Sequence, residues 1–271
     1  MNRRNFTALI VLTASLSAIA CAQVLPPSAP VASLTASNSS PTIKLTVSAA
    51  ASVQDAMKDV QVAYQEVAPQ VKITYNFGSS GSLAQQINQG APVDVFLSAS
   101  PLWMDDLESK SGILADSRQD LLQNAMTLVV PKNATDVASF QDLSTDQTQK
   151  IAMGEPESVP AGRYAKEVLD TLNLFDVIQP KLVFAKDVRQ VLAYVETGNV
   201  DAGLVYATDA QMTDRVQAIA TAPTATHAPI IYPVAVVQES DELEAAQAFV
   251  EFLASEPATA IFQGYGFGMA E

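Results

Sequence analysis

Hydrophobic positions along the chain follow two alternating periods from residue 43 onward. Short runs of β-forming residues indicate strands at 43–48, 71–77 and 93–97. Between the first two runs, apolar residues recur every three to four positions, which indicates a helix that Pro69 ends. Leu83 opens a further helix, and another begins with a proline at 101–108. This alternation of strand and helix predicts an α/β fold with a mainly parallel sheet.

A buried-type strand at 125–131 changes this rhythm, and a second strand of the same character lies at 232–237. Two matched strands that bracket a central α/β unit predict two lobes joined by two crossovers. The elements predicted between and after them are strands at 151–153, 181–184 and 201–206, and helices at 160–172, 187–197, 243–253 and 257–262. We therefore expect lobe 1 to comprise 42–123 plus 238–271, and lobe 2 to comprise 124–237 with the crossover strands.

Several predicted helix starts combine the features of an anion site. Pro160 suits the first helical position, where a missing N–H costs nothing, and Ala161, Gly162 and Arg163 then present free backbone N–H groups. Such N–H groups and the positive end of the helix dipole attract anions. Similar starts follow strands at Ser52, at Ser79 and Ser80, and at Asp187. Because ligands of α/β sheets sit beyond the carboxyl ends of the strands, we expect these starts to converge.

Each of these residues also has a purely structural interpretation. Ser52 with Asp55, and Asp187 with Gln190, have the spacing of helix caps. Ser79 and Ser80 could be ordinary turn residues, and Tyr206 could be a core residue at the end of an apolar strand. For three further side chains we expect surface positions, with the arginines on solvated helix faces: Arg163, Arg189 and His227.

Charge and motif content exclude several functions. The formal net charge of −14 argues against nucleic acid binding, which requires a basic surface. The run from Gly78 to Gly81 is not a nucleophile elbow, and a single distant histidine makes a hydrolase triad improbable. The chain also shows no metal-ligand cluster and no nucleotide loop. We therefore predict a protein that is not an enzyme and has no cofactor.

The N-terminus predicts export. A positive start followed by a short apolar run indicates a signal peptide at 1–20, and Arg3-Arg4-Asn5-Phe6 resembles a twin-arginine motif. Cys21 directly follows the small-residue cleavage site and is a candidate for lipidation, although plain cleavage beside an incidental cysteine would give the same pattern. Residues 21–41 are rich in Pro, Ser, Ala and Thr and are predicted to form a flexible tether.

Taken together, the ordered motifs of the chain closely resemble the periplasmic molybdate-binding proteins of ABC importers. The motifs are 49–52, 77–84, 90–96, 154–156, 159–162, 187–189, 203–206 and 232–237. The resemblance implies a two-lobed periplasmic binding protein of type II-like fold. It also implies a monomer in the periplasm or on the outer face of the cytoplasmic membrane. This monomer would deliver molybdate or tungstate to a permease and its ATPase subunits.

The resemblance further implies the residues that hold the ligand. Molybdenum would be bound as an oxyanion, not as a free metal cation, by the hydroxyl groups and backbone N–H groups of Ser52, Ser80, Ala161, Val188 and Tyr206. Ser79 and Gly162 are secondary candidates, and the choice between Ser79 and Ser80 stays open. Neutral donors of this kind also suit another tetrahedral oxyanion such as sulfate, so sulfate stays open as the alternative ligand.

Overall fold

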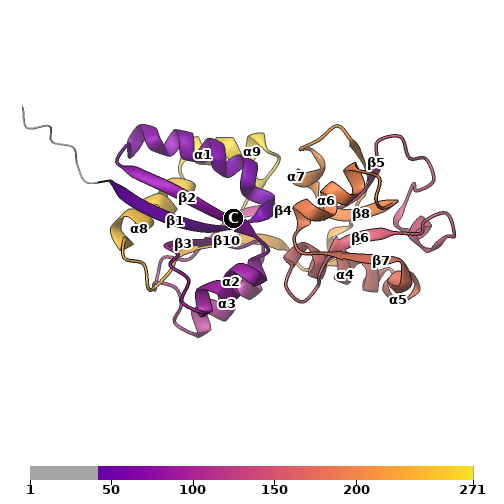
Figure 1. Ribbon diagram of the computed structural model, residues 1–271, viewed down its shortest axis with the longest axis horizontal. Coiled ribbons are helices and arrows are strands. Elements are labelled where there is room, and N and C mark those ends of the chain that lie inside the picture. The colour runs from indigo at the N-terminus through magenta and orange to yellow at the C-terminus, as the bar shows by residue number, and fades with distance from the viewer. Residues whose placement is uncertain (1–41, 271) are drawn as a thin grey trace, which may run out of the picture. The chain divides into compact units, whose positions relative to one another are not determined.

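Two β-sheets organise the part of the chain that the computed structural model describes, residues 42–270. The predicted signal peptide, Cys21 and the predicted tether lie outside these residues. Within 42–270, each sheet carries its own set of helices, and the two sets form separate lobes (Figure 1). None of the helices in this range has both the length and the apolar character needed to cross a membrane.

The first lobe contains a six-stranded mixed sheet in the order β11-β4-β10-β3-β1-β2. Strand β1 runs parallel to β2 and β3, whereas β10 runs antiparallel to β3 and β4. The strands are β1 (Ile43–Ala50), β2 (Val71–Gly78), β3 (Val95–Leu97), β4 (Gln119–Asn124), β10 (Ile230–Val236) and β11 (Gly268–Met269). Parallel strands therefore form one half of this sheet and antiparallel strands the other.

Helices cover both faces of this first sheet. Helices α1 (Gln54–Val67), α8 (Leu243–Leu253) and α9 (Glu256–Gly264) pack together on one face, and α2 (Ser80–Asn88) and α3 (Pro101–Ser109) on the other (Figure 1). The apolar face predicted for α1 is buried, and its Tyr64 ring lies 4.9 Å from the Phe249 ring of α8. These aromatic contacts fix α1 and α8 against one another and orient the start of α1.

The second lobe contains a five-stranded mixed sheet in the order β7-β6-β8-β5-β9. Strand β6 runs parallel to β7 and β8, and β5 runs antiparallel to β8 and β9. The strands are β5 (Met126–Pro131), β6 (Ile151–Gly154), β7 (Leu182–Ala185), β8 (Ala202–Tyr206) and β9 (Val216–Thr221). The helices are α4 (Pro160–Thr171), α5 (Phe175–Ile178), α6 (Val188–Glu196) and α7 (Ala207–Ala210).

The chain passes between the lobes twice, at adjacent places. Only Ala125 separates β4 from β5, and the return passage runs from β9 to β10. The two passages lie side by side, because Ile230 pairs with Asn124 and the Ala222 N–H donates to the Met126 carbonyl at 2.8 Å. Two neighbouring connections of this kind form a hinge.

The predicted lobe boundary at residue 237 is wrong. We expected the strand at 232–237 to belong to the second lobe, but β10 lies in the first sheet between β3 and β4. The error has a physical reason, because β10 is buried almost throughout, as β5 is. An apolar strand that is covered on both faces carries no pattern that distinguishes one sheet from the other.

Candidate functional site

A small cavity lies between the lobes, where the starts of α2, α4 and α6 face the 3₁₀ turn η1 (Ala51–Val53). Its volume is only about 10 Å³. Pockets for drug-sized ligands occupy about 300–1,000 Å³, so this tightly closed cavity excludes a ligand of that size. Six of the residues expected at the site line it: Ser52, Ser79, Ser80, Ala161, Val188 and Tyr206.

Ser52 reaches the cavity from the 3₁₀ turn that follows β1. It is buried, and its hydroxyl forms a 3.0 Å hydrogen bond with the Tyr232 hydroxyl of β10. The capping role considered for Ser52 is wrong, because α1 begins at Gln54 with Val53 as its N-cap and without a side-chain cap. The 3₁₀ turn shifts the N-cap of the helix by one residue, from Ser52 to Val53, and leaves the Ser52 hydroxyl at the cavity wall beside Tyr232.

Ser79 and Ser80 have different roles at the start of α2. Ser79 is the N-cap, and its hydroxyl accepts from the Ser82 N–H and donates to the Ser82 hydroxyl. Ser80 is fully buried, and its Oγ accepts from the Ala99 N–H at 2.9 Å. The hydroxyl proton of Ser80 has no acceptor within residues 42–270 and can be donated into the cavity. The geometry therefore favours Ser80 as the hydroxyl donor.

The second lobe presents backbone N–H groups from two helices. Pro160 occupies the first turn of α4 as predicted, and the Ala161 N–H has no backbone acceptor among the described residues. Asp187 caps α6 as predicted, because its Oδ1 accepts from the Gln190 N–H at 2.8 Å. This cap leaves the N–H of Val188, the first residue of α6, at the cavity wall.

Gly162 does not line the cavity, contrary to the secondary prediction. Its N–H donates to the Val159 carbonyl at 2.9 Å, and it packs against the end of β6. A Cβ atom added at Gly162 would lie 2.1 Å from the carbonyl oxygen of Gly154. Gly162 is therefore needed for the close approach of α4 to β6, which brings the Ala161 N–H to the cavity.

Tyr206 ends β8 with its side chain directed into the cavity. Only 1% of the residue is exposed, yet its hydroxyl has no partner within residues 42–270. Burial, with a smaller contribution from Tyr232, raises the pKa of Tyr206 well above its usual value, so the hydroxyl stays protonated. Buried polar groups in proteins almost always have a partner. An unpaired donor at a cavity wall therefore indicates a ligand with an acceptor atom.

The arginines do not lie on solvated helix faces, and that prediction is wrong. Arg163 of α4 donates to the Ser100 hydroxyl of the first lobe at 2.9 Å. Arg189 of α6 donates to the Ser52 carbonyl at 3.2 Å and pairs with Asp55 at 3.0 Å. Both side chains bridge the lobes, and neither lines the cavity. The helical spacing placed them away from their own lobe, but it could not show that the other lobe covers them.

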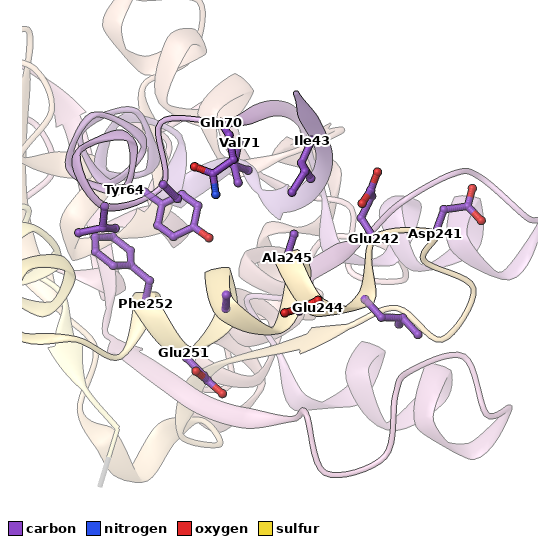
Figure 2. A pocket seen from close by; sticks show the side chains of 14 residues that line it. Ile43, Tyr64, Gln70, Val71, Asp241, Glu242, Glu244, Ala245, Glu251 and Phe252 are labelled. Carbon is purple, nitrogen blue, oxygen red and sulfur yellow. The ribbon is translucent and has the colours of Figure 1, made fainter. Parts of the chain in front are cut away.

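A second, larger groove lies on the first lobe between the end of α1 and α8 (Figure 2). Tyr64 and Phe252 form an apolar side of this groove, and Glu242, Glu244 and Glu251 supply carboxylates. These carboxylates would repel an anion. The groove is therefore not an alternative to the cavity between the lobes. His227 lines neither the groove nor the cavity. It is half buried, and its ring centroid lies 6.1 Å from that of Tyr164.

A family model of bacterial extracellular solute-binding proteins matches residues 45–268. The chain belongs to this family. Solute-binding proteins bind and present a ligand without transforming it, so the prediction of a protein that is not an enzyme is confirmed. The family also confirms the prediction that the protein is exported and acts outside the cytoplasm.

This solute-binding protein has relatives that align along most of its length. It is 46% identical over 226 residues to YvgL of Bacillus subtilis, named as a candidate ABC transporter substrate-binding lipoprotein, with 83% of this chain and 86% of YvgL covered. It is 41% identical over 229 residues to the molybdate-binding protein ModA of Escherichia coli, with 83% and 88% covered. The chain is thus identified as a member of the predicted family.

A solved structure confirms the two-lobed fold of this solute-binding protein. It is the substrate-binding domain of a candidate molybdenum ABC transporter from Clostridium difficile, which is 45% identical, with a TM-score of 0.66. The match covers 84% of this chain and all of that domain. The predicted two-lobed α/β fold class is therefore correct, whereas the prediction of mainly parallel sheets is wrong, because both sheets are mixed in strand direction.

Proposed function

We propose that this solute-binding protein binds molybdate or tungstate between its lobes and delivers it to the permease and ATPase subunits of an ABC importer. The observation that carries the proposal is the unpaired Tyr206 hydroxyl in a cavity whose other polar groups include neutral donors from both lobes. The proposal is also supported by the 41% identity to a protein named for molybdate binding.

The donors of the cavity suit a dehydrated oxyanion. The proposed ligand residues are Ser52, Ser80, Ala161, Val188 and Tyr206. A hydrogen bond to a charged group contributes roughly 1.5–3 kcal/mol. Five such bonds supply roughly 8–15 kcal/mol before the costs of desolvation and ordering are subtracted. A net value of roughly −8 to −12 kcal/mol would correspond to micromolar to nanomolar affinity. The described residues that line the cavity include one carboxylate, Asp187, whose Oδ1 is engaged in the cap of α6, and no lysine, arginine or histidine, so the binding energy comes from oriented dipoles.

Sulfate is the second candidate ligand, because it accepts the same hydrogen bonds. Calorimetric titration of the chain from Ala22, which lacks the candidate lipidation residue Cys21, with molybdate, tungstate, sulfate and phosphate separates the candidates. We expect heat of binding with molybdate and tungstate and none with sulfate or phosphate. Binding of sulfate alone would keep the donor site and replace the ligand, whereas silence with all four anions would contradict the proposal.

We also propose that the protein acts as a monomer that is anchored to the outer face of the cytoplasmic membrane through a lipid on Cys21. The proposal rests on the position of Cys21 after the predicted signal peptide and on the name of the B. subtilis relative. Intact-mass analysis of the exported protein should show the mass of a lipid. Cys21→Ala should release the protein into the soluble fraction, and an unchanged mass and distribution would contradict the anchor.

A further inference from the structure

The side chain of Arg189 connects the two walls of the cavity. Its Nε pairs with Asp209 of its own lobe at 2.7 Å, whereas Nη1 pairs with Asp55 and Nη2 donates to the Ser52 carbonyl, both in the first lobe. Each nitrogen of the guanidinium thus has a separate partner. A planar guanidinium with three fixed partners is well suited to hold two surfaces in one relative position.

Asp209 fixes the direction of this guanidinium. Its side chain is fully buried in the short helix α7, directly after Tyr206 and β8. A buried carboxylate is costly unless it is paired, and Arg189 is the cation that pairs with it among the described residues. Arg189 therefore has a close ionic contact in its own lobe, although the geometry of this contact is not that of a hydrogen bond. Partial ordering of the side chain by this contact reduces the entropy lost when the cross-lobe contact forms.

The contacts of Arg189 are placed next to two proposed ligand donors. Arg189 directly follows Val188, and the carbonyl that it holds belongs to Ser52. Arg189 itself does not line the cavity. It can therefore influence the ligand only through the positions of Val188 and Ser52 relative to one another.

We propose that Arg189 is a positioning residue that clasps the closed lobes and sets how long the bound anion is retained. Asp55 and Ser52 belong to the first lobe and Arg189 to the second, so separation of the lobes must break these contacts. Closing forms them again after the anion has entered. The clasp therefore slows dissociation and leaves association nearly unchanged. This inference rests on the proposed function, because it assumes that the cavity holds an oxyanion.

Asp55→Asn is the first test, because it removes the cross-lobe charge and leaves the pair of Arg189 with Asp209 intact. Stopped-flow kinetics with molybdate should show a dissociation rate about tenfold higher and an association rate within about threefold of wild type. Asp55→Glu should restore slow dissociation. Arg189→Met should raise the dissociation rate at least as much, although it leaves Asp209 unpaired and could lower the thermal stability.

Asp59→Asn is the matched control. Asp59 lies one turn further along α1, and its carboxylate accepts from the Tyr265 hydroxyl within the first lobe. The same charge is removed from the same helix, so an effect of net charge alone would appear in both variants. We expect wild-type kinetics for Asp59→Asn. Equal dissociation rates for wild type and Asp55→Asn would overturn the clasp. If the wild type still bound molybdate, the proposed function would be unaffected by that result.

A measurement of lobe separation tests the clasp without any ligand. Spin labels at Val62→Cys in the first lobe and Val177→Cys in the second would report the distance, since both positions are exposed and the chain from Ala22 has no other cysteine. In ligand-free protein, Asp55→Asn should shift the distance distribution toward longer separations. Identical distributions with and without Asp55→Asn would overturn the clasp, whether or not the wild type binds molybdate.

Discussion

Tyr206 illustrates what single residues reveal before and after the fold is known. At the end of an apolar strand, its sequence context fits a core residue as well as a ligand donor. The structure places its hydroxyl, buried and unpaired, at the cavity wall. Ser79 and Ser80 were equally ambiguous, and hydrogen bonds to the neighbouring backbone distinguish them. Sequence could name such residues but not the partners of their side chains.

Replacement of Tyr206 by phenylalanine should weaken molybdate binding. The lost hydrogen bond to a charged acceptor corresponds to roughly 1.5–3 kcal/mol, or about a 10- to 100-fold increase in Kd by calorimetry. The ligand-free protein should keep its melting temperature, because the hydroxyl has no partner within residues 42–270. Tyr265→Phe is the control, since its hydroxyl bonds to Asp59 far from the cavity lining. Unchanged affinity for Tyr206→Phe would remove this residue from the site.

Helix starts are the elements that the sequence predicted best. Pro160 and Asp187 both occupy their expected positions, because the local chemistry of a proline or a capping carboxylate decides where a helix begins. Ser52 differs, since a 3₁₀ turn intervenes before α1. The assignment of β10 to its sheet failed for another reason, because sheet membership depends on residues far away in the chain. Local signals thus predicted the elements, and distant pairings determined their arrangement.

The start of α2 also touches the second lobe directly. The Gly81 N–H donates to the Ser158 carbonyl at 3.0 Å across the cleft. A Cβ atom at Gly81 would lie 2.5 Å from that carbonyl oxygen and 2.7 Å from the Trp103 ring. The two backbones can meet here only because residue 81 is glycine.

Gly81→Ala should therefore hold the lobes apart. We expect Kd for molybdate to increase about tenfold, because overpacking at the contact costs about 1–3 kcal/mol. Opening of the cleft removes the clash with the Ser158 carbonyl, so the melting temperature of the ligand-free protein should fall only as far as the remaining contact with the Trp103 ring of the first lobe requires. Gly264→Ala in α9 is the matched control, where an added Cβ meets no atom within 4 Å. Wild-type affinity for Gly81→Ala would show that closure does not need this contact.

At the scale of the whole molecule, the sequence predicted two lobes and two crossings but not how charges meet between them. Arg163 and Arg189 find their partners in the opposite lobe. Asp209 is fully buried in this arrangement, because both its own lobe and the Arg189 side chain cover it. Burial raises the pKa of Asp209 to about 7, although Arg189 acts in the opposite direction, and Asp187 and Asp55 add smaller increases.

The pKa of Asp209 predicts a pH dependence of stability. Because its folded value of about 7 exceeds the ordinary value of 3.8, its favourable contribution is complete below about pH 4 and is lost as the pH rises through about 7. The free energy of unfolding should thus decrease between about pH 4 and 7, by at most roughly 4 kcal/mol. Urea unfolding at several pH values should show this slope, flattened in Asp209→Asn and retained in the exposed-site control Asp176→Asn. A slope that Asp209→Asn leaves unchanged would assign it to another group.

The insertion of β10 between β3 and β4 has a consequence for the order in which the chain can fold during synthesis. All strands of the second lobe lie within 126–221, so that sheet can form as soon as this segment has emerged. Strand β4 pairs only with β10 and β11, which are made about a hundred residues later. The sheet of the first lobe therefore stays incomplete, with unpaired backbone groups at one edge, until the C-terminal segment has been synthesised. Until that segment arrives, the incomplete edge is accessible to any factor that binds unpaired strands.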